Sequence, residues 1–146
     1  MEVSFYDVAA GNLIPTLVRL LEKIFLSNQR CVFFTPLEER LKVVDKMLWT
    51  FSTNAFVPHG DKSLGFSEHQ PIYFTSLSEN PNHASVLVMT DSFDYQSHGG
   101  DFQRIIFFFE GEEQRKNAQE LHETLKKKCN NVNYWRQSPK GWEKVM

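Results

Sequence analysis

The first fifty residues alternate between short apolar runs and longer stretches with helical spacing. Residues 3–8 (VSFYDV) are aromatic and β-branched, which predicts a strand. From Leu13 onwards, apolar side chains return every three or four positions until residues 27–29 end the pattern, which predicts an amphipathic helix. Residues 30–35 (RCVFFT) form a continuous apolar run, as in a parallel strand buried on both faces, and a second helical stripe covers residues 37–51. This order of elements indicates a parallel sheet with crossover helices.

The second half of the chain predicts more strands. Three apolar segments separated by polar turns are expected to join the sheet, namely 71–75, 85–90 and 102–109. The last of these is the most apolar and is expected at the centre of the sheet. Residues 131–137 predict a short strand at an edge, followed by a tail over residues 138–146 in which Trp142 is expected to be a buried anchor.

One closing helix is predicted over residues 112–129. Its apolar stripe is thin, so it should pack on one side only, and it has acids at its start and lysines at its end, as the helix dipole favours. The complete pattern predicts an α/β class fold. We expect a three-layer, Rossmann-like arrangement with a mostly parallel sheet and crossover helices, in a single domain covering residues 1–146.

Composition and charge narrow the classes of function. The 146 residues carry a formal net charge of -2, so no broad basic field is available to attract nucleic acid. The two cysteines, Cys31 and Cys129, show no metal-binding spacing, and we expect no metal ion and no disulfide framework. The N-terminus has no basic signal region, and no apolar run approaches about 20 residues. We therefore expect a cytoplasmic protein without a membrane segment.

The sequence lacks the usual signatures of a nucleotide site or a hydrolase. A dinucleotide-binding Rossmann domain needs several glycines in its first turn, and residues 9–12 offer only Gly11. We therefore predict no nucleotide-binding glycine loop and no cofactor. Cys31 lies in a buried strand, where a thiol behaves as a small hydrophobe, and no GxSxG motif is present.

His59 supports an alternative interpretation. It precedes Gly60 and Asp61, so a His–Asp pair is conceivable, and Asp7 could join it. This alternative is a small α/β enzyme or nucleotide-binding protein with an unrecognised site near His59. A single histidine in a loop is more often a hydrogen-bonded turn residue.

Basic and aromatic side chains gather near the C-terminus. Lysines 126–128 are followed by a set of large aromatics and cations: Tyr134, Trp135, Arg136, Lys140, Trp142 and Lys144. Such a set could hold an acidic peptide with an apolar end. It could also grip single-stranded nucleic acid through Trp135 and Trp142. The third interpretation is a solvated helix end with no partner.

One string in the middle of the chain is the most specific. It runs D-x-x-L-W…F-V-P-H and comprises Asp45, Leu48, Trp49, Phe56, Val57, Pro58 and His59. With residues 5–8 (FYDV), 20–23 (LLEK), the strand after Arg30, Pro71-Ile72 and the closing residues 132–135 and 141–142, it resembles the chi subunit of bacterial DNA polymerase III, a clamp-loader accessory protein. The resemblance spans nearly the whole chain.

The resemblance implies a Rossmann-like fold without a nucleotide site and a protein without catalytic activity. It implies two partners: the acidic, apolar-ended C-terminal tail of single-stranded DNA-binding protein, and the psi subunit or another clamp-loader component. DNA would be contacted only indirectly.

Chi-like proteins bind the tail with basic residues and a tyrosine on the last helix. Arg115 matches one basic position, whereas Gln119 and His122 stand where an arginine and the tyrosine are expected. Lys126 and Lys127 could compensate. The expected tail site is therefore Arg115, Lys126, Lys127, Tyr134 and Trp135.

Overall fold

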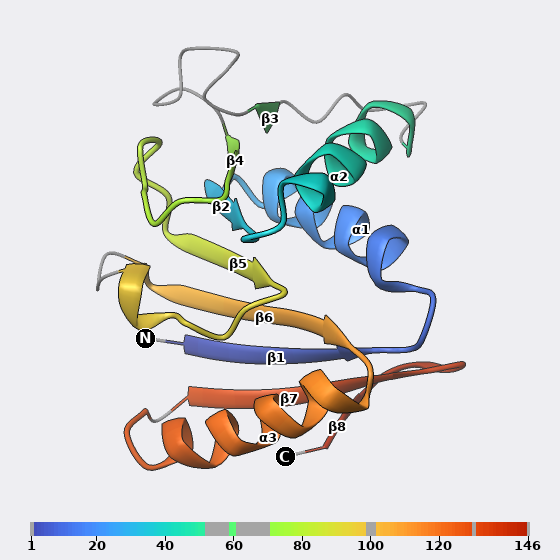
Figure 1. Ribbon diagram of the computed structural model, residues 1–146, viewed down its shortest axis with the longest axis vertical. Helices are drawn as coiled ribbons and strands as arrows, with labels where there is room; N and C mark the ends of the chain where they lie inside the picture. The colour runs from blue at the N-terminus through green and yellow to red at the C-terminus, as the bar shows by residue number, and fades with distance from the viewer. Residues whose placement is uncertain (1, 52–58, 61–70, 99–101, 130, 146) are drawn as a thin grey trace.

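The strands that the structure describes form one sheet of eight, and most of them run parallel. The computed structural model describes residues 2–51, 59–60, 71–98, 102–129 and 131–145 (Figure 1). The elements in chain order are β1 (Glu2–Val8), α1 (Leu13–Leu26), β2 (Cys31–Phe34), α2 (Glu38–Phe51), β3 (His59–Gly60), β4 (Ile72–Thr75), β5 (Val86–Thr90), η3 (Gln96–His98), β6 (Arg104–Glu110), α3 (Glu112–Lys126), β7 (Asn131–Ser138) and β8 (Gly141–Lys144). The strand order is β3-β4-β2-β5-β6-β1-β7-β8, and the β7–β8 pair alone is antiparallel.

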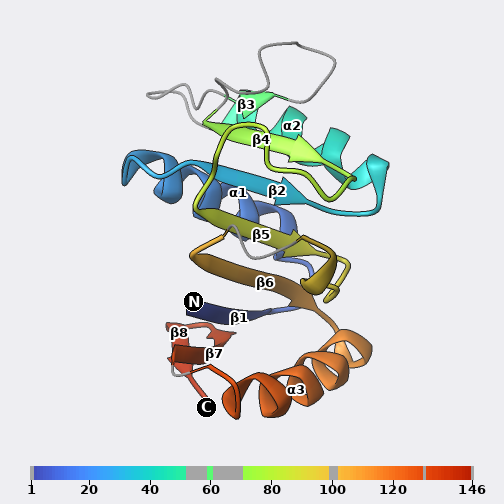
Figure 2. The ribbon, with the colours of Figure 1, turned by 90° about the vertical axis from the view of Figure 1, so that its left-hand side faces the viewer.

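Two cores cover the two faces of the sheet. On one face, α1 and α2 pack against alternate strand residues such as Phe33, Val88 and Phe108. On the other, α3 contributes Ala118 and Leu125 to a core with the strand residues of opposite parity. Figure 2 shows α2 beside β3 and β4 at one end of the sheet, α1 behind the middle strands β2 and β5, and α3 at the other end, beside β7. This arrangement confirms the predicted three-layer, Rossmann-like α/β fold.

The apolar strand predicted at the centre lies there. β6 pairs with β5 on one side and β1 on the other, and Ile105 to Phe109 are all buried. Phe5 of β1 stacks on Phe107 with ring centroids 5.0 Å apart and is itself fully buried. The centre of the sheet is thus an aromatic layer, which anchors the strands that carry the site described below.

The predictions for the chain from residue 131 onwards were wrong in three respects. β7 is not an edge strand, because it pairs with β1 in parallel and with β8 in antiparallel. The expected tail instead folds back as β8 through a turn in which Gly141 has φ +122°, a value that side chains rarely allow. Trp142 lies in β8 with 36% of its surface exposed, so it is not a buried anchor. The short polar pattern of β8 carried no strand signal.

Candidate partner-binding surfaces

A buried carboxylate organises the α3 side of the sheet. Asp7, near the end of β1, has a side chain that is 1% exposed. Arg115 of α3 donates to both of its oxygens, with Nε–Oδ2 2.7 Å and Nη2–Oδ1 3.2 Å. Arg136 of β7 donates from Nε to Oδ2 at 3.4 Å, and the Tyr134 hydroxyl donates to Oδ2 at 3.2 Å. Two guanidinium groups therefore share one carboxylate, which leaves this cluster with a formal charge of +1.

The sequence places these groups together by strand parity. Residues 3, 5 and 7 of β1 face α3, because side chains alternate along a strand. Tyr134 pairs with Phe5 in the parallel register and stacks on it with ring centroids 5.9 Å apart. The hydrogen bond to Asp7 raises the pKa of Arg115, so its guanidinium stays charged and fixed. Arg115 thus ties α3 to the sheet and keeps 32% of its side chain exposed.

Tyr134 should make stability depend on alkaline pH. Burial, followed by the charge of Asp7, raises the pKa of Tyr134 to about 12. Its value in the unfolded chain is about 10, so the folded state holds the phenolic proton more tightly. Stability is therefore full below about pH 10 and falls as pH rises towards about 12, by about 2 kcal/mol from this group.

The variant Tyr134→Phe tests this dependence. It is expected to cost about 1 kcal/mol at neutral pH, since one hydrogen bond is lost while Asp7 keeps Arg115. It should also flatten the fall in unfolding free energy between neutral pH and about pH 11, measured by urea denaturation. Equal slopes in the variant and the parent protein would contradict the assignment.

The lysines lie at the other end of α3. Lys126, Lys127 and Lys128 are all exposed. Arg115 and Lys126 are eleven positions apart, which places them on the same stripe of the helix about 16 Å from each other. Gln119, between them, is exposed, whereas His122 is 2% exposed and packs edge-on against Tyr134. Burial lowers the pKa of His122, so its ring is a neutral part of the core.

The structure divides the five residues of the expected tail site. Arg115 and Tyr134 meet at Asp7, and Tyr134 is fully buried beneath α3. Lys126 and Lys127 stand apart at the C-terminal end of the helix. Trp135, the next residue after Tyr134, points to the opposite face of the sheet.

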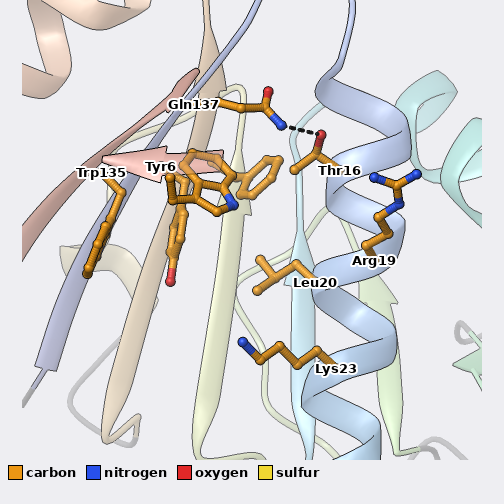
Figure 3. A pocket seen from close by; sticks show the side chains of 9 residues that line it. Tyr6, Thr16, Arg19, Leu20, Lys23, Trp135 and Gln137 are labelled. Carbon is orange, nitrogen blue, oxygen red and sulfur yellow. Dashed lines mark hydrogen bonds between the residues drawn. The ribbon is translucent and has the colours of Figure 1, made fainter. Parts of the chain in front are cut away.

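The opposite face of the sheet holds a cavity. The sequence did not indicate that the residues lining it lie together. The cavity has a volume of about 360 Å³ and is lined by Tyr6, Thr16, Arg19, Leu20, Lys23, Phe108, Trp135, Gln137 and Trp142. Figure 3 shows Leu20 and Lys23 extending from α1 towards Tyr6, and the hydrogen bond from Gln137 to Thr16 at 3.3 Å closes one end. One side of this cavity could have been found from the sequence, because helical spacing places four of its residues on one face of the helix: Thr16, Arg19, Leu20 and Lys23.

The grouping of His59 with Asp7 was wrong. β3, which holds His59, and β1, which holds Asp7, are separated by β4, β2, β5 and β6. Five strand spacings amount to about 24 Å, so these two residues cannot share one site. Asp61 lies outside the described residues.

Most of the D-x-x-L-W…F-V-P-H string is at the margin of what the structure describes. Asp45, Leu48 and Trp49 belong to α2, and Leu48 is buried in its core. His59 pairs with Ile72 of β4 through the short strand β3. Phe56, Val57 and Pro58 lie outside the described residues. The buried position of Leu48 indicates packing of α2 onto the sheet.

The first strand-to-helix turn is already occupied by side chains. Gly11, at φ +84°, donates its amide to Glu110 Oε2 at 3.0 Å, and the Ala9 amide donates to Gln137 Oε1 at 3.0 Å. A pyrophosphate bound here would meet the Glu110 carboxylate instead of open amides. Burial raises the pKa of Cys31, so that thiol is unreactive. Among the described residues, no three His, Cys, Asp or Glu side chains cluster as metal ligands would.

Comparison with known proteins identifies the family. A family model described as DNA polymerase III chi subunit, HolC, matches residues 1–131. The chain belongs to this family. A probable DNA polymerase III subunit chi from Rickettsia prowazekii (strain Madrid E) is 37% identical over 93 residues, covering 64% of this chain and 56% of the relative. The chain thus matches little more than half the length of that chi subunit.

The family match covers the surfaces above only in part. It includes all of α3, but it ends at residue 131, so Trp135, Gln137 and Trp142 of the cavity lie beyond it.

In the portion of this chi-family chain that the structure describes, every helix is too short or too polar to cross a bilayer.

Proposed function

We propose that this chi-family chain is a non-catalytic accessory subunit of the DNA polymerase III holoenzyme in the cytoplasm. It would link the clamp loader to single-stranded DNA-binding protein by holding the acidic C-terminal tail of the latter. The psi subunit or another clamp-loader component would be its second partner. The observation that carries the tail proposal is the exposed run Lys126 to Lys128 at the end of α3, in a chain of net charge -2.

The lysine end of α3 is the better place for a carboxylate-rich tail. Lys126 belongs to the last turn of the helix, and its flexible ammonium can follow an extended acidic peptide. Partly buried apolar side chains, Leu121, Cys129 and Val132, pack against the core near this end and would receive the apolar end of the tail. Electrostatic attraction of this kind mainly sets the association rate and the partner chosen.

The Arg115 end contributes differently. The Asp7 cluster has a formal charge of +1, and 43% of the Arg136 side chain is exposed. The first turn of α3 also carries Glu112 and Glu113, which oppose an incoming acid. Arg115 is therefore expected to position α3 and to assist the tail only as a secondary contact. Trp135, on the other face, would act in a separate contact.

Charge reversal at the lysine end tests the tail proposal. The double variant K126E/K127E is expected to bind a labelled peptide of the tail about tenfold more weakly, since two attractions become repulsions at an exposed surface. Fluorescence anisotropy at low and moderate salt is the measurement. Lys42→Glu, an exposed lysine on α2, is the matched control and should bind normally.

Two results would contradict the tail proposal. One is no binding of the peptide at high micromolar concentration. The other is equal binding by the K126E/K127E variant and the Lys42→Glu control.

The second partner can be tested by gel filtration. The chain and a purified clamp loader should elute together in one peak.

A further inference from the structure

The cavity between α1 and the β6–β1–β7–β8 end of the sheet is built from aromatic side chains in register. Tyr6 pairs with Phe108 on one side and with Trp135 on the other, so these three rings share one face of the sheet. Trp142 pairs with Gln137 in the β7–β8 hairpin and extends the row. Its ring lies edge-on to Tyr6, with centroids 5.1 Å apart and planes at 83°.

Three rings of this face, those of Tyr6, Trp135 and Trp142, are accessible to solvent, whereas Phe108 between them and β5 is buried. Phe5 and Phe107, on the α3 side, are fully buried. Tyr6 and Trp135 are partly exposed, and Trp142 is 36% exposed beside a cavity of about 360 Å³. Large rings that border an accessible hollow are placed for a ligand with flat apolar faces.

Positively charged side chains of α1 also line the cavity. Arg19 and Lys23, one turn apart on α1, are both exposed, and none of the nine described lining residues carries a carboxylate. Lys144 pairs with Trp135, so it extends from the same face of the hairpin. Farther along this face, the Glu2 carboxylate forms an ion pair with Arg104, with Nε and Oε1 3.8 Å apart. The cavity therefore combines stacking surfaces with cations, in a protein whose overall charge is negative.

We propose that this cavity binds single-stranded DNA directly, with a base stacked on the Trp135 and Trp142 wall and the adjoining phosphates held by Arg19, Lys23 and Lys144. Every base has a flat face, so stacking of this kind tolerates any sequence. Duplex DNA hides those faces and would not fit. The proposal goes beyond tail binding, because it uses the opposite face of the sheet and residues that follow the family match.

The small number of cations allows a quantitative prediction of how affinity depends on salt concentration. Binding through three phosphate contacts gives a slope of about -2 for the logarithm of affinity against the logarithm of salt concentration. A protein that relied on an extended basic groove would show a steeper slope. The salt dependence thus distinguishes a small stacking site from general polyanion binding.

The test uses the full chain and a labelled oligodeoxythymidylate of about a dozen nucleotides. Anisotropy should report saturable binding, with little binding of a duplex of equal length. Trp142→Ala should weaken binding about tenfold, as loss of one stacked base predicts, whereas Trp142→Phe should retain most of it. Lys23→Gln, at an exposed position where folding is not at risk, should weaken binding and lower the salt slope by about 0.7.

Matched variants separate this site from the tail site. K126E/K127E should leave oligonucleotide binding nearly unchanged and weaken the tail peptide, and Lys23→Gln should do the reverse. Absence of oligonucleotide binding, or affinities untouched by both Trp142→Ala and Lys23→Gln, would overturn the proposal while leaving tail binding at Lys126 and Lys127 intact. If Lys23→Gln weakens the tail peptide instead, the cavity is a peptide site and the DNA proposal is wrong.

Discussion

Replacing Asp7 with alanine is expected to lower the free energy of unfolding by about 3 kcal/mol. The change leaves Arg115 without the carboxylate to which it donates two hydrogen bonds, and leaves the buried Tyr134 hydroxyl without its acceptor. Arg115 and Arg136 are 32% and 43% exposed, so water can solvate part of their charge. The cost therefore falls near the lower end of the range for breaking a buried ion pair.

The measurement for Asp7 is chemical denaturation with a thermal melt. A loss of this size corresponds to about 10 °C in melting temperature for a domain of this length. Glu113→Ala, which removes an exposed acid from the first turn of α3, is the control and should cost under about 0.5 kcal/mol. If Asp7→Ala matches that control, the cluster does not hold α3 to the sheet.

The Asp7 cluster also determines how Arg115 variants must be interpreted. Arg115→Ala removes the arginine that pairs with the buried Asp7 carboxylate at 2.7 Å. The change should therefore destabilise the fold as well as weaken the binding of any partner at this site. A double-mutant cycle with Asp7→Ala should give a coupling energy of at least about 1 kcal/mol, because the two side chains are in direct contact. Loss of tail binding in Arg115→Ala can therefore be interpreted only when the stability of that variant is measured as well. Variants of Lys126 and Lys127 test the binding surface directly.

Replacing Phe5 with alanine is expected to cost about 4 kcal/mol, more than the loss expected for Asp7→Ala. Phe5 is fully buried in β1 and stacks on both neighbouring strands, with centroids 5.0 Å from Phe107 and 5.9 Å from Tyr134. It also meets His122 of α3 edge-on at 5.8 Å. Deleting the ring leaves a cavity where two strands and a helix meet, and the rigid strands cannot close it.

Urea denaturation of Phe5 variants measures this cost. Phe5→Leu, which keeps most of the apolar volume, should cost about 1.5 kcal/mol. Leu26→Ala is the control, since Leu26 is 63% exposed at the end of α1 and its truncation should cost under about 0.5 kcal/mol. A Phe5→Ala loss below about 2 kcal/mol would show that the aromatic layer can repack.

The elements that the sequence predicted well are those whose side chains bury on a regular face. The apolar run 102–109 corresponds to β6, and the periodic stripe from Leu13 corresponds to α1. β8 was missed because its four residues are all exposed, so hydrophobicity does not specify them. Its position is decided by pairing with β7 across the Gly141 turn, a contact between residues with no apolar periodicity.

The functional residues were harder to predict because their grouping depends on the strand order. Tyr134 and Trp135 are adjacent in sequence, yet strand alternation sends one into the α3 core and the other to the cavity on the α1 side. Likewise, the sequence suggested a site that grouped Asp7 with His59, whereas in the structure Asp7 accepts hydrogen bonds from two arginines, one on α3 and one on β7. Charged residues distant in sequence give no local signal of such pairing.

The sequence alone determined the α/β class, the parallel sheet with crossover helices and the likeness to the chi family, because apolar periodicity and a conspicuous string of residues are local properties. Only the tertiary structure decided that Arg115 is tied to Asp7, that Lys126 stands apart from it, and that Tyr6, Trp135 and Trp142 surround one cavity with Lys23. The physical reason is that strand order, register and the hairpin at β7–β8 bring together side chains from opposite ends of the chain.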